Sequence, residues 1–434
     1  MRAGDIRVIF AKIGRRADEM HVARGPFSRA RRWYAALRES ASRLRDPRFI
    51  DVRNLMRQTP LAEHLANADA YFRDAGWNTM HARKPFANPA EAEQLIRALW
   101  VLVPNLELFP GAKLLDFGAG TCWSSLIFGY LGCEVIATDV SHNALRFGEE
   151  RVRADPIGTS LPITFLPFDG RRLEVADASV DRVAGIDALH HVLDVPATLA
   201  ELSRVLRPDG IVGFSEPGPL HSLSAQSQFE MSTHGVIEND VRVEKVERWA
   251  HEAGFAQMRV AWFSPHAKLM DVDEFRRMVE RRPDANAARK AADAVATDLA
   301  NIRIFFLYKG GTRKLTSRGR EGLIAAIQHD LNWDCGRLRG TVSVRNMGRA
   351  TWLPSGSGIG EVNVGIQLVH QDGKAEKDYA RAALSAVPVH AGESARAEID
   401  VACPRGSSVT LDLVAEGVTW FASVGSATVH VLCR

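Results

Sequence analysis

A carboxylate followed by two closely spaced glycines is the first pattern in this chain that predicts a ligand-binding site. The stretch Lys113–Gly120 reads K-L-L-D-F-G-A-G and leads into an apolar segment, Trp123–Leu131, that ends at Gly132. Glycine permits positive φ and lets a ligand lie against bare backbone at a helix N-terminus. The stretch therefore predicts a strand, a tight turn and a helix built around a ligand.

Two histidines, His190 and His191, follow a later apolar run at residues 182–186. In parallel sheets with helical crossovers, ligands bind outside the carboxyl ends of the strands. We therefore expect both histidines to lie at the same edge of the sheet as the glycine turn.

Short apolar runs alternate with helical segments from about residue 112 to residue 310. Such alternation is typical of an α/β fold, a doubly wound, Rossmann-like parallel sheet. Ser141 and Pro196 are start signals of two helices, and Pro208-Asp209-Gly210 predicts a turn. The predicted strands are 114–115, 135–138, 163–166, 182–186, 211–215, 257–263 and 302–308, and the predicted helices are 123–131, 142–153, 197–206 and an insertion at 272–300.

The spacing of the glycines separates two classes of ligand. A dinucleotide fingerprint has a third glycine three residues after the second, where the helix packs closely. Trp123 stands at that position here, and its bulky indole argues against a dinucleotide-binding dehydrogenase. The pattern Asp116-x-Gly118-x-Gly120 instead resembles motif I of the class I S-adenosylmethionine-dependent methyltransferases.

This resemblance covers about residues 112–216 and implies S-adenosylmethionine as the cofactor. Val205–Gly210 is similar to the turn that precedes the fifth strand in the family. Cys122 stands where the family often has a further glycine, and we interpret it as structural, because no neighbouring cation in the sequence would lower the pKa of its thiol. The resemblance implies a cradle of Asp116, Gly118, Ala119 and Gly120, ribose contacts from Asp139 beside Val140, adenine contacts from Phe168 and Asp169, and a methionine contact near Asp187.

The chemistry follows from the cofactor, whose sulfonium makes the methyl group electrophilic. The protein must place the acceptor in line and, for a hydroxyl, supply a base. His190 and His191 are the candidate catalytic residues, although such a pair could instead shape the cofactor pocket. Glu216, His221 and His234 form a further candidate rim. No clustered ligand spacing predicts a metal site, including one at Asp187 with Glu216.

Residues 1–110 are predicted to form a helical N-terminal region. Asn88 can cap a helix that starts at Pro89, with Glu91 reaching back. Leu95, Ile96, Leu99 and Trp100 share one face of that helix, which predicts packing on the next domain. The alternative is a lid over the ligand, with Trp77 and Phe86 before it.

The remaining chain divides into residues 111–312, the methyltransferase-like region, a linker at 313–334 with a helix-like stretch at 321–331, and residues 335–434. The last part alternates short strands with turns, at 340–345, 362–369, 395–401, 409–414 and 427–432, as a β-sandwich does. The segments 344–353 and 411–421 resemble an immunoglobulin-like module fused to bacterial enzymes of polysaccharide biosynthesis. Trp352, Trp420 and Phe421 could stack on sugars or fill the core.

Composition and charge bound the remaining possibilities. Residues 1–53 carry fourteen Lys and Arg against six Asp and Glu, so this segment could contact an anionic membrane, although a solvated helical face is the simpler interpretation. We expect no nucleic-acid partner and no secretion signal. The cysteines are odd in number, scattered and without C-x-x-C spacing, which favours free thiols and a cytoplasmic location. The oligomeric state stays open.

The sequence thus favours an S-adenosylmethionine-dependent methyltransferase that O-methylates a saccharide or a surface-polysaccharide precursor. The substrate class rests on the resemblance of the C-terminal region, and a fold does not fix a function. Two alternatives stay open. One is a methyltransferase of a small metabolite or lipid, and the other is a glycan-recognition or assembly protein that binds the cofactor without turnover.

Overall fold

The computed structural model describes residues 49–75, 80–261, 302–310 and 315–434, with single positions between 272 and 293. Most of the basic segment 1–53, Trp77 and most of the predicted insertion 272–300 lie outside the described residues. Helices precede the central sheet, as predicted, at α3 (Val52–Gln58), α4 (Leu61–Ala75), α5 (Met80–Arg83) and α6 (Pro89–Asn105).

A seven-stranded sheet forms the centre of the chain, in the order β3-β2-β1-β4-β5-β7-β6. Strands β1 to β5 are parallel to their neighbours, whereas β7 is antiparallel to both β5 and β6. This differs from the six-stranded dinucleotide-binding order by the antiparallel strand between the fifth and sixth positions. The strands are β1 (Lys113–Phe117), β2 (Glu134–Asp139), β3 (Ile163–Pro167), β4 (Val180–Ile186), β5 (Leu206–Pro217), β6 (Gln257–Val260) and β7 (Ile302–Tyr308).

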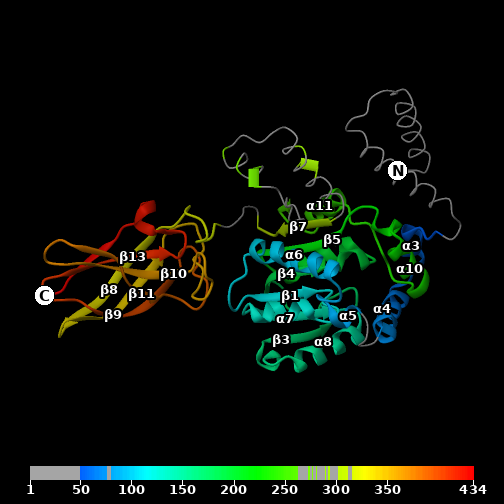
Figure 1. Cartoon of the computed structure of the whole chain (residues 1–434), viewed down its shortest axis with the longest axis horizontal. Helices are drawn as coiled ribbons and strands as arrows, with labels where there is room; N and C mark the ends of the chain where they lie inside the picture. Colours follow the sequence, from blue (N-terminus) through cyan, green and yellow to red (C-terminus); the bar gives the residue numbers. More distant parts are fainter. Residues whose placement is uncertain are drawn as a thin grey trace, which may run out of the picture. The chain divides into compact units, whose positions relative to one another are not determined.

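Helices cover both faces of this sheet, as the α/β pattern predicts (Figure 1). Alternate residues of one strand point to opposite faces, so Leu115 packs against α9 and α11, whereas Leu114 packs against α6 and α7. Both faces of the sheet are therefore buried, which explains its nearly continuous apolar strands. The remaining helices of this region are α7 (Trp123–Tyr130), α8 (His142–Ala154), α9 (Val195–Val205), α10 (Ala225–His234) and α11 (Val243–Glu252).

Local signals in the sequence set several helix boundaries. The Asn88 side chain accepts a hydrogen bond from the Glu91 N–H at 3.0 Å, and the Ser141 hydroxyl accepts one from Ala144 at 3.0 Å. These two caps confirm the predictions. Pro196 lies in the first turn of α9, which confirms it as a start signal, and Asp194 caps the helix because its carboxylate accepts from the Ala197 N–H.

Two details of the prediction are wrong in ways that packing explains. Helix α6 buries Leu95, Leu99 and Leu102 against the sheet, whereas Ile96 and Trp100 face solvent, with 46% and 78% of their surfaces exposed. The buried stripe is therefore rotated from the predicted one. Residues 207–210 bulge out within β5, since the register passes from Val180↔Leu206 to Arg182↔Ile211. The predicted turn is thus an insertion within a strand.

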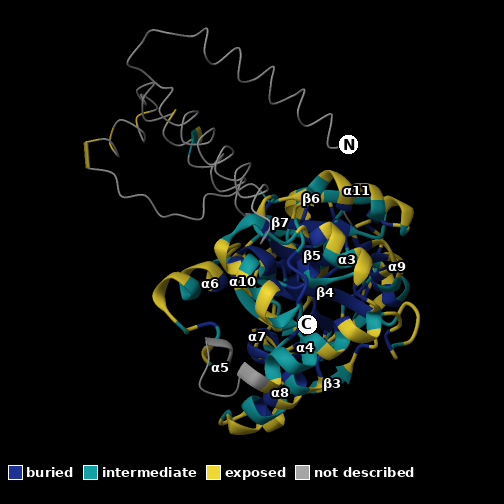
Figure 2. Cartoon of the chain, turned by 90° about the vertical axis from the view of Figure 1, so that its right-hand side faces the viewer, coloured by how far each residue is buried: buried dark blue, intermediate teal, exposed yellow. Residues whose placement is uncertain are grey.

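Helices α3, α4 and α10 gather at one side of the sheet (Figure 1). Seen from that side, the buried strands β4 and β5 lie behind them (Figure 2). Asn67 of α4 donates to the Gly235 carbonyl at the end of α10, at 3.1 Å. Of the described helices, α4 is therefore the better candidate for a lid over the ligand. Helix α6 packs on the sheet instead, and Phe86 before it is 69% exposed.

Two antiparallel sheets make up the C-terminal β unit, residues 315–434. One sheet holds β12, β9 and β8, and the other holds β11, β10, β13, β14 and β15. Their inner faces share one hydrophobic core, in which Val342 and Ile399 meet Ile366 and Leu411. The strands are β8 (Ala325–Asp334), β9 (Arg337–Asn346), β10 (Val362–Val369), β11 (Ala375–Ala383), β12 (Ser394–Ala402), β13 (Ser408–Ala415), β14 (Thr419–Trp420) and β15 (Val429–Leu432).

Strand β8 lies where the sequence suggested a linker with a helix-like stretch, so that prediction is wrong. Ile327, Leu331 and Trp333 occupy alternate positions of the strand, and this period of two places them all on the core side. The β unit thus begins before the predicted boundary at residue 335. Trp352 and Phe421 are also buried in its core, with ring centroids 5.5 Å apart, and are unavailable for stacking on a sugar.

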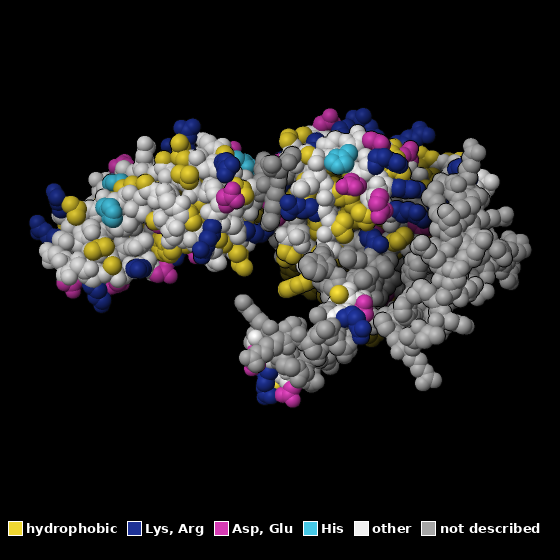
Figure 3. Space-filling view, turned by 90° about the horizontal axis from the view of Figure 1, so that it is seen from above, with side chains coloured by type: hydrophobic (Ala, Val, Ile, Leu, Met, Phe, Trp, Pro, Cys, Tyr) yellow, Lys and Arg dark blue, Asp and Glu magenta, His cyan; other side chains and the backbone are white. Residues whose placement is uncertain are grey.

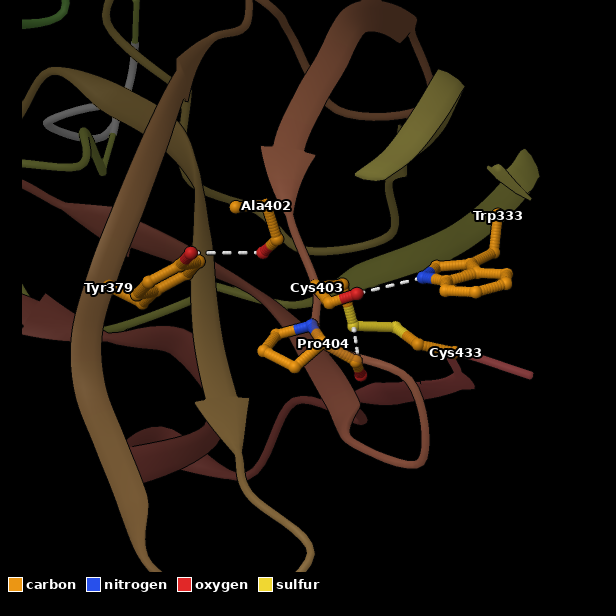
Figure 4. The surroundings of a disulfide bond; sticks show 6 residues. All are labelled: Trp333, Tyr379, Ala402, Cys403, Pro404 and Cys433. Atoms are coloured by element: carbon orange, nitrogen blue, oxygen red, sulfur yellow. Dashed lines mark hydrogen bonds between the residues drawn. A yellow bond between two sulfur atoms is a disulfide. The ribbon is translucent and has the colours of Figure 1, made fainter. Parts of the chain in front are cut away.

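A disulfide joins Cys403 to Cys433, which contradicts the prediction of free thiols throughout (Figure 4). The pair is 30 residues apart in sequence, and no local spacing reveals it. Pairing of β13 with β15 brings the two segments together, with Val409 opposite Val431. Trp333 donates its indole N–H to the Cys403 carbonyl at 2.8 Å. The free thiols are Cys122, Cys133 and Cys335. The inference of a cytoplasmic location from free thiols therefore applies to three of the five cysteines.

On one face of the molecule, Lys and Arg side chains are interspersed with Asp and Glu (Figure 3). The excess positive charge predicted to meet a membrane belongs to residues 1–53, only the end of which is described. Among the described helices, none is both long enough and apolar enough to cross a bilayer.

Candidate functional site

The predicted glycine turn joins β1 to α7 and requires unusual backbone angles. Gly118 and Gly120 have φ values of 66° and 52°, in the left-handed region that favours glycine. A Cβ at Gly118 would lie 2.4 Å from the Ala188 Cβ, so the turn presses directly against the end of β4. The two turns on either side of the β1–β4 boundary are therefore in contact, with Ala119 buried between them and the neighbouring core.

Asp139 ties the end of β2 to this turn. One of its carboxylate oxygens accepts the Gly120 N–H at 2.9 Å, and the other accepts the Ser141 N–H at 2.9 Å. Burial raises the pKa of Asp139, whereas these N–H donors work against that rise. The carboxylate thus stands at the glycine turn, where the sequence placed it, and Val140 beside it is half-buried against the core.

The Asp116 carboxylate binds the first turn of α7 and is not open to solvent. Its carboxylate accepts hydrogen bonds from the hydroxyls of Ser124 and Ser125 at 2.7 and 2.6 Å, and the residue is only 1% exposed. Burial raises its pKa to about 6, against the effect of the two serines. Asp116 therefore holds the first turn of α7 in place beneath the glycines.

Phe168 and Asp169 follow β3 as predicted, in different environments. The Phe168 N–H donates to the Asp139 carbonyl at 2.9 Å, and its buried ring lies edge-on to Phe117 at 5.9 Å. Asp169 is exposed and accepts hydrogen bonds from the backbone of Arg172 and Arg171, which lower the pKa of its carboxyl. Asp169 therefore belongs to its own turn and presents its remaining lone pairs to solvent.

Cys122 is buried away from solvent beside the glycine turn. Its φ of 55° is left-handed, which explains why the related sequences often have glycine at this position. Its sulfur fills the space over Gly148 of α8, where an added Cβ would lie 2.2 Å away. Burial raises the pKa of its thiol, which agrees with a structural role for Cys122.

His190 lies in the short 3₁₀ helix η2 (Leu189–His191) after β4 and is 4% exposed. Its Nδ1 lies 2.8 Å from Oε2 of Glu216, at the end of β5. Glu216 also accepts the backbone N–H groups of Ala188, Leu189 and His190, so it holds the whole turn. Burial raises the pKa of Glu216 to about 7 and lowers that of His190. Glu216 therefore fixes the orientation of His190.

His191 is the open member of the pair, with 44% of its side chain exposed. Its Nδ1 lies 2.7 Å from the Ile237 carbonyl and 3.5 Å from Glu238, so this nitrogen carries the proton and donates it. The ring's Nε2 is left as the acceptor. The centroid of the His191 ring lies 3.9 Å from that of His190, with the two planes tilted by 43°, so the two predicted histidines lie together but face different partners.

His221, one of the three residues of the predicted rim, lies beside these histidines. Its Nε2 lies 2.7 Å from Oε2 of Glu238, which also accepts the Ser227 hydroxyl at 3.0 Å. Its ring is 4.9 Å from that of His190. His234 instead ends α10, with its ring 5.0 Å from that of Tyr71. Asp187 has a φ of 52° and donates its N–H to the Ser215 carbonyl, while burial raises the pKa of its side chain.

Residues 115–214 match the protein family described as a methyltransferase domain. This part of the chain is therefore a methyltransferase domain. The cofactor of this domain is S-adenosylmethionine, as the glycine turn and Asp139 indicated from the sequence.

Two relatives illustrate the extent of the similarity. The chain is 37% identical over 124 residues to a demethylmenaquinone methyltransferase of Parafrankia sp., covering 26% of this chain and 48% of that protein. It is 29% identical over 171 residues to the demethylmenaquinone methyltransferase of Mycobacterium marinum, covering 36% and 70%. The chain spans about half the length of the first such relatives it matches. An S-adenosylmethionine-dependent methyltransferase structure from Mesorhizobium loti aligns with 49% of this chain and 95% of its own, at 20% identity and a TM-score of 0.35.

Helix α4 contributes residues to the methyltransferase domain that the sequence did not reveal. Asp69 accepts hydrogen bonds from the Ser141 hydroxyl and from the Asn143 N–H, and so caps α8 next to Asp139. The Phe72 ring lies over the glycine turn, 3.8 Å from where a Cβ on Gly120 would be. His64 is buried, and burial together with the charge of His191 lowers its pKa to about 4. Their only signal in the sequence is helical spacing.

Proposed function

We propose that this chain transfers the methyl group of S-adenosylmethionine to a hydroxyl oxygen, with His191 as the general base. The observation that supports this proposal is the setting of His191. The Ile237 carbonyl holds the proton on Nδ1, and the side chain is 44% exposed beside the glycine turn. An imidazole whose Nε2 can accept a proton at the open end of a site is the arrangement a general base needs.

The reaction then balances as a single displacement. Nε2 of His191 takes the proton from the acceptor hydroxyl while the oxygen attacks the methyl carbon. The carbon–sulfur bond breaks, its electron pair stays on sulfur, and S-adenosylhomocysteine leaves with the methylated product. His190, buried and bound to Glu216, is a positioning residue in this scheme, because it supports the His191 ring from behind.

For the acceptor, we propose a saccharide or a polysaccharide precursor. The resemblance of the C-terminal β unit to an immunoglobulin-like module supports this choice, and we propose that fold for its two sheets. With Trp352 and Phe421 in the core, Trp420 is the remaining aromatic candidate, half-buried with Arg381 4.7 Å from the centre of its ring. The names of the relatives, demethylmenaquinone methyltransferases, favour a small-molecule acceptor as the second candidate.

Methyl transfer from isotopically labelled S-adenosylmethionine to two acceptor panels tests this proposal. One panel holds glycans and the other holds small hydroxylated ring compounds, and the full chain is used with both. We expect transfer to glycans, and a His191→Gln variant that transfers roughly 10²- to 10⁴-fold more slowly with unchanged cofactor affinity. Binding of the cofactor without transfer to either panel would favour the non-catalytic alternative. Equal rates of methyl transfer by the native and His191→Gln proteins would show that His191 is not the general base.

A further inference from the structure

Two imidazoles and a carboxylate meet beside the proposed base, in an arrangement that methyl transfer alone does not require. His190, His221 and Glu238 each offer one nitrogen or oxygen, and these atoms all lie within 4.8 Å of one another. The three residues come from separate segments of the chain: η2, the 3₁₀ helix η3 (His221–Leu223) and the loop before α11. The Asn239 N–H donates to the His190 carbonyl at 2.9 Å and ties two of these segments together.

The setting of His190 is that of a metal ligand. Its Nδ1 is bound to Glu216, so Nε2 is the atom that it offers to the cluster. Histidines that bind metals usually donate their other ring N–H to a carboxylate, which fixes the tautomer and the ring orientation. Glu216 is itself held by backbone N–H groups and has no exposed side-chain surface. The carboxylate behind His190 is therefore rigid.

The burial of the cluster favours a cation. The Glu238 side chain is only 7% exposed and lies against the imidazoles of His221 and His191, at 2.7 and 3.5 Å. His190 is 4% exposed. A buried carboxylate oxygen next to imidazole nitrogens is a ligand set suited to a divalent ion.

We propose that His190, His221 and Glu238 bind a divalent transition-metal ion of the zinc type. Two histidines and one glutamate form the ligand set of open zinc sites, which leave a fourth position for water or substrate. Donor atoms on a tetrahedral zinc ion lie about 3.4 Å apart, given bonds near 2.1 Å. The 2.7 Å contact between His221 and Glu238 must therefore widen on binding. His221 is 23% exposed, more than the other two ligands, and is the ligand that moves.

The role of the ion rests on the proposed function. At its free position the ion binds the acceptor oxygen and lowers the pKa of the acceptor hydroxyl. His191 then takes a proton that is already more acidic. Glu238 is shared between the two, because its Oε1 lies 3.5 Å from His191 Nδ1 while its Oε2 faces His221.

Zinc retention tests the site without cofactor or acceptor. The full chain is stripped with a chelator, loaded with zinc ions, passed through a desalting column and analysed for metal by mass spectrometry. We expect one zinc ion per native chain, and one fewer in a His221→Asn/Glu238→Gln variant. Glu216→Gln should weaken zinc affinity about 10- to 100-fold. His234→Asn is the matched control on the neighbouring helix and should retain the ion.

The outcomes separate the site from its role. Equal zinc content in the native and double-variant chains would overturn the site, and circular dichroism confirms that each variant is folded. Substitution by cobalt(II) gives a second readout, because the visible spectrum of four-coordinate cobalt should appear in the native chain and be absent from the double variant. If the stripped enzyme methylates an acceptor as fast as the loaded one, the ion's role in activating the acceptor is wrong. Failure to find any methyl acceptor would leave the zinc result standing, so the two proposals fail separately.

Discussion

Replacing Asp139 by asparagine should weaken cofactor binding sharply. The native carboxylate accepts the Gly120 and Ser141 N–H groups, each at 2.9 Å. An amide keeps one acceptor oxygen and turns an NH₂ group toward the other N–H, so the glycine turn loses one contact. In the cofactor site that the resemblance implies, the ribose hydroxyls also lose a charged acceptor. Hydrogen bonds to charged groups contribute about 1.5–3 kcal/mol each, so we expect a loss of about 2–4 kcal/mol, roughly 30- to 700-fold in affinity.

Calorimetry with S-adenosylmethionine and S-adenosylhomocysteine measures this loss. Asp177→Asn is the control, because Asp177 is exposed and pairs with Arg204 before β4 begins, at the opposite end of that strand from Asp187. We expect its affinity to change by less than about tenfold. An Asp139→Asn protein that melts at the native temperature and binds both ligands as tightly as the native chain would refute the assignment of Asp139.

The same carboxylate predicts a pH dependence. Burial raises the pKa of Asp139 above the ordinary 3.8, so the folded protein takes up this proton at a higher pH than an exposed aspartate does. Only the ionised form accepts from both N–H groups and from ribose hydroxyls. Cofactor affinity should therefore fall as the pH is lowered through the raised pKa. In Asp139→Asn this fall should be absent, and a native affinity that stays constant down to pH 4 would contradict the mechanism.

Three further predictions concern the framework around the site. Gly118→Ala would place a Cβ 2.4 Å from that of Ala188 at a φ of 66°, so calorimetry should show loss of cofactor binding and a lowered melting temperature. Replacing Cys403 and Cys433 by serine opens a loop of 30 residues, which should destabilise the β unit by about 3–4 kcal/mol, measured by hydrogen exchange of β13. Asp116→Asn should be more stable than the native chain at pH 7 by up to about 3 kcal/mol and equal at pH 3, because the native pKa of about 6 exceeds the unfolded 3.8 and stability is lost as the pH rises between them. Urea unfolding across that range checks the last prediction.

The central sheet could be predicted because local sequence determines it. Strands β1 and β4 are short, largely apolar runs that end where Gly118 and Asp187 begin, and both faces of the sheet are buried. Asp139 lies one residue beyond its predicted strand, and the resemblance to the methyltransferase family implied its place in the site. Strand β8 was missed because His329 stands at a core-side position of its alternating pattern, between Ile327 and Leu331.

Other parts of the site depend on contacts distant in sequence. Glu238 lies in the loop after α10, and it contacts His221 only because the fold brings that loop next to η3. Asp69 and Phe72 come from a helix some seventy residues before Asp139 and Ser141, in a segment with no motif. The disulfide likewise depends on the pairing of β13 with β15. Sequence periodicity places a residue on a face of its own element, but not against a partner from another element.

The site divides at the boundary between β1 and β4, and this division limits where the methyl group can go. The turn after β1 and Asp139 after β2 lie on one side, and they are the groups that we expect to hold the cofactor. His191 after β4 and the Glu216 and Glu238 carboxylates lie on the side of β5. Gly118 touches Ala188 at the boundary, so in the proposed reaction the methyl group of the cofactor points across it toward His191. We therefore expect substitutions on the β2 side to alter cofactor affinity, and substitutions in η2, η3 and the loop that carries Glu238 to alter acceptor choice.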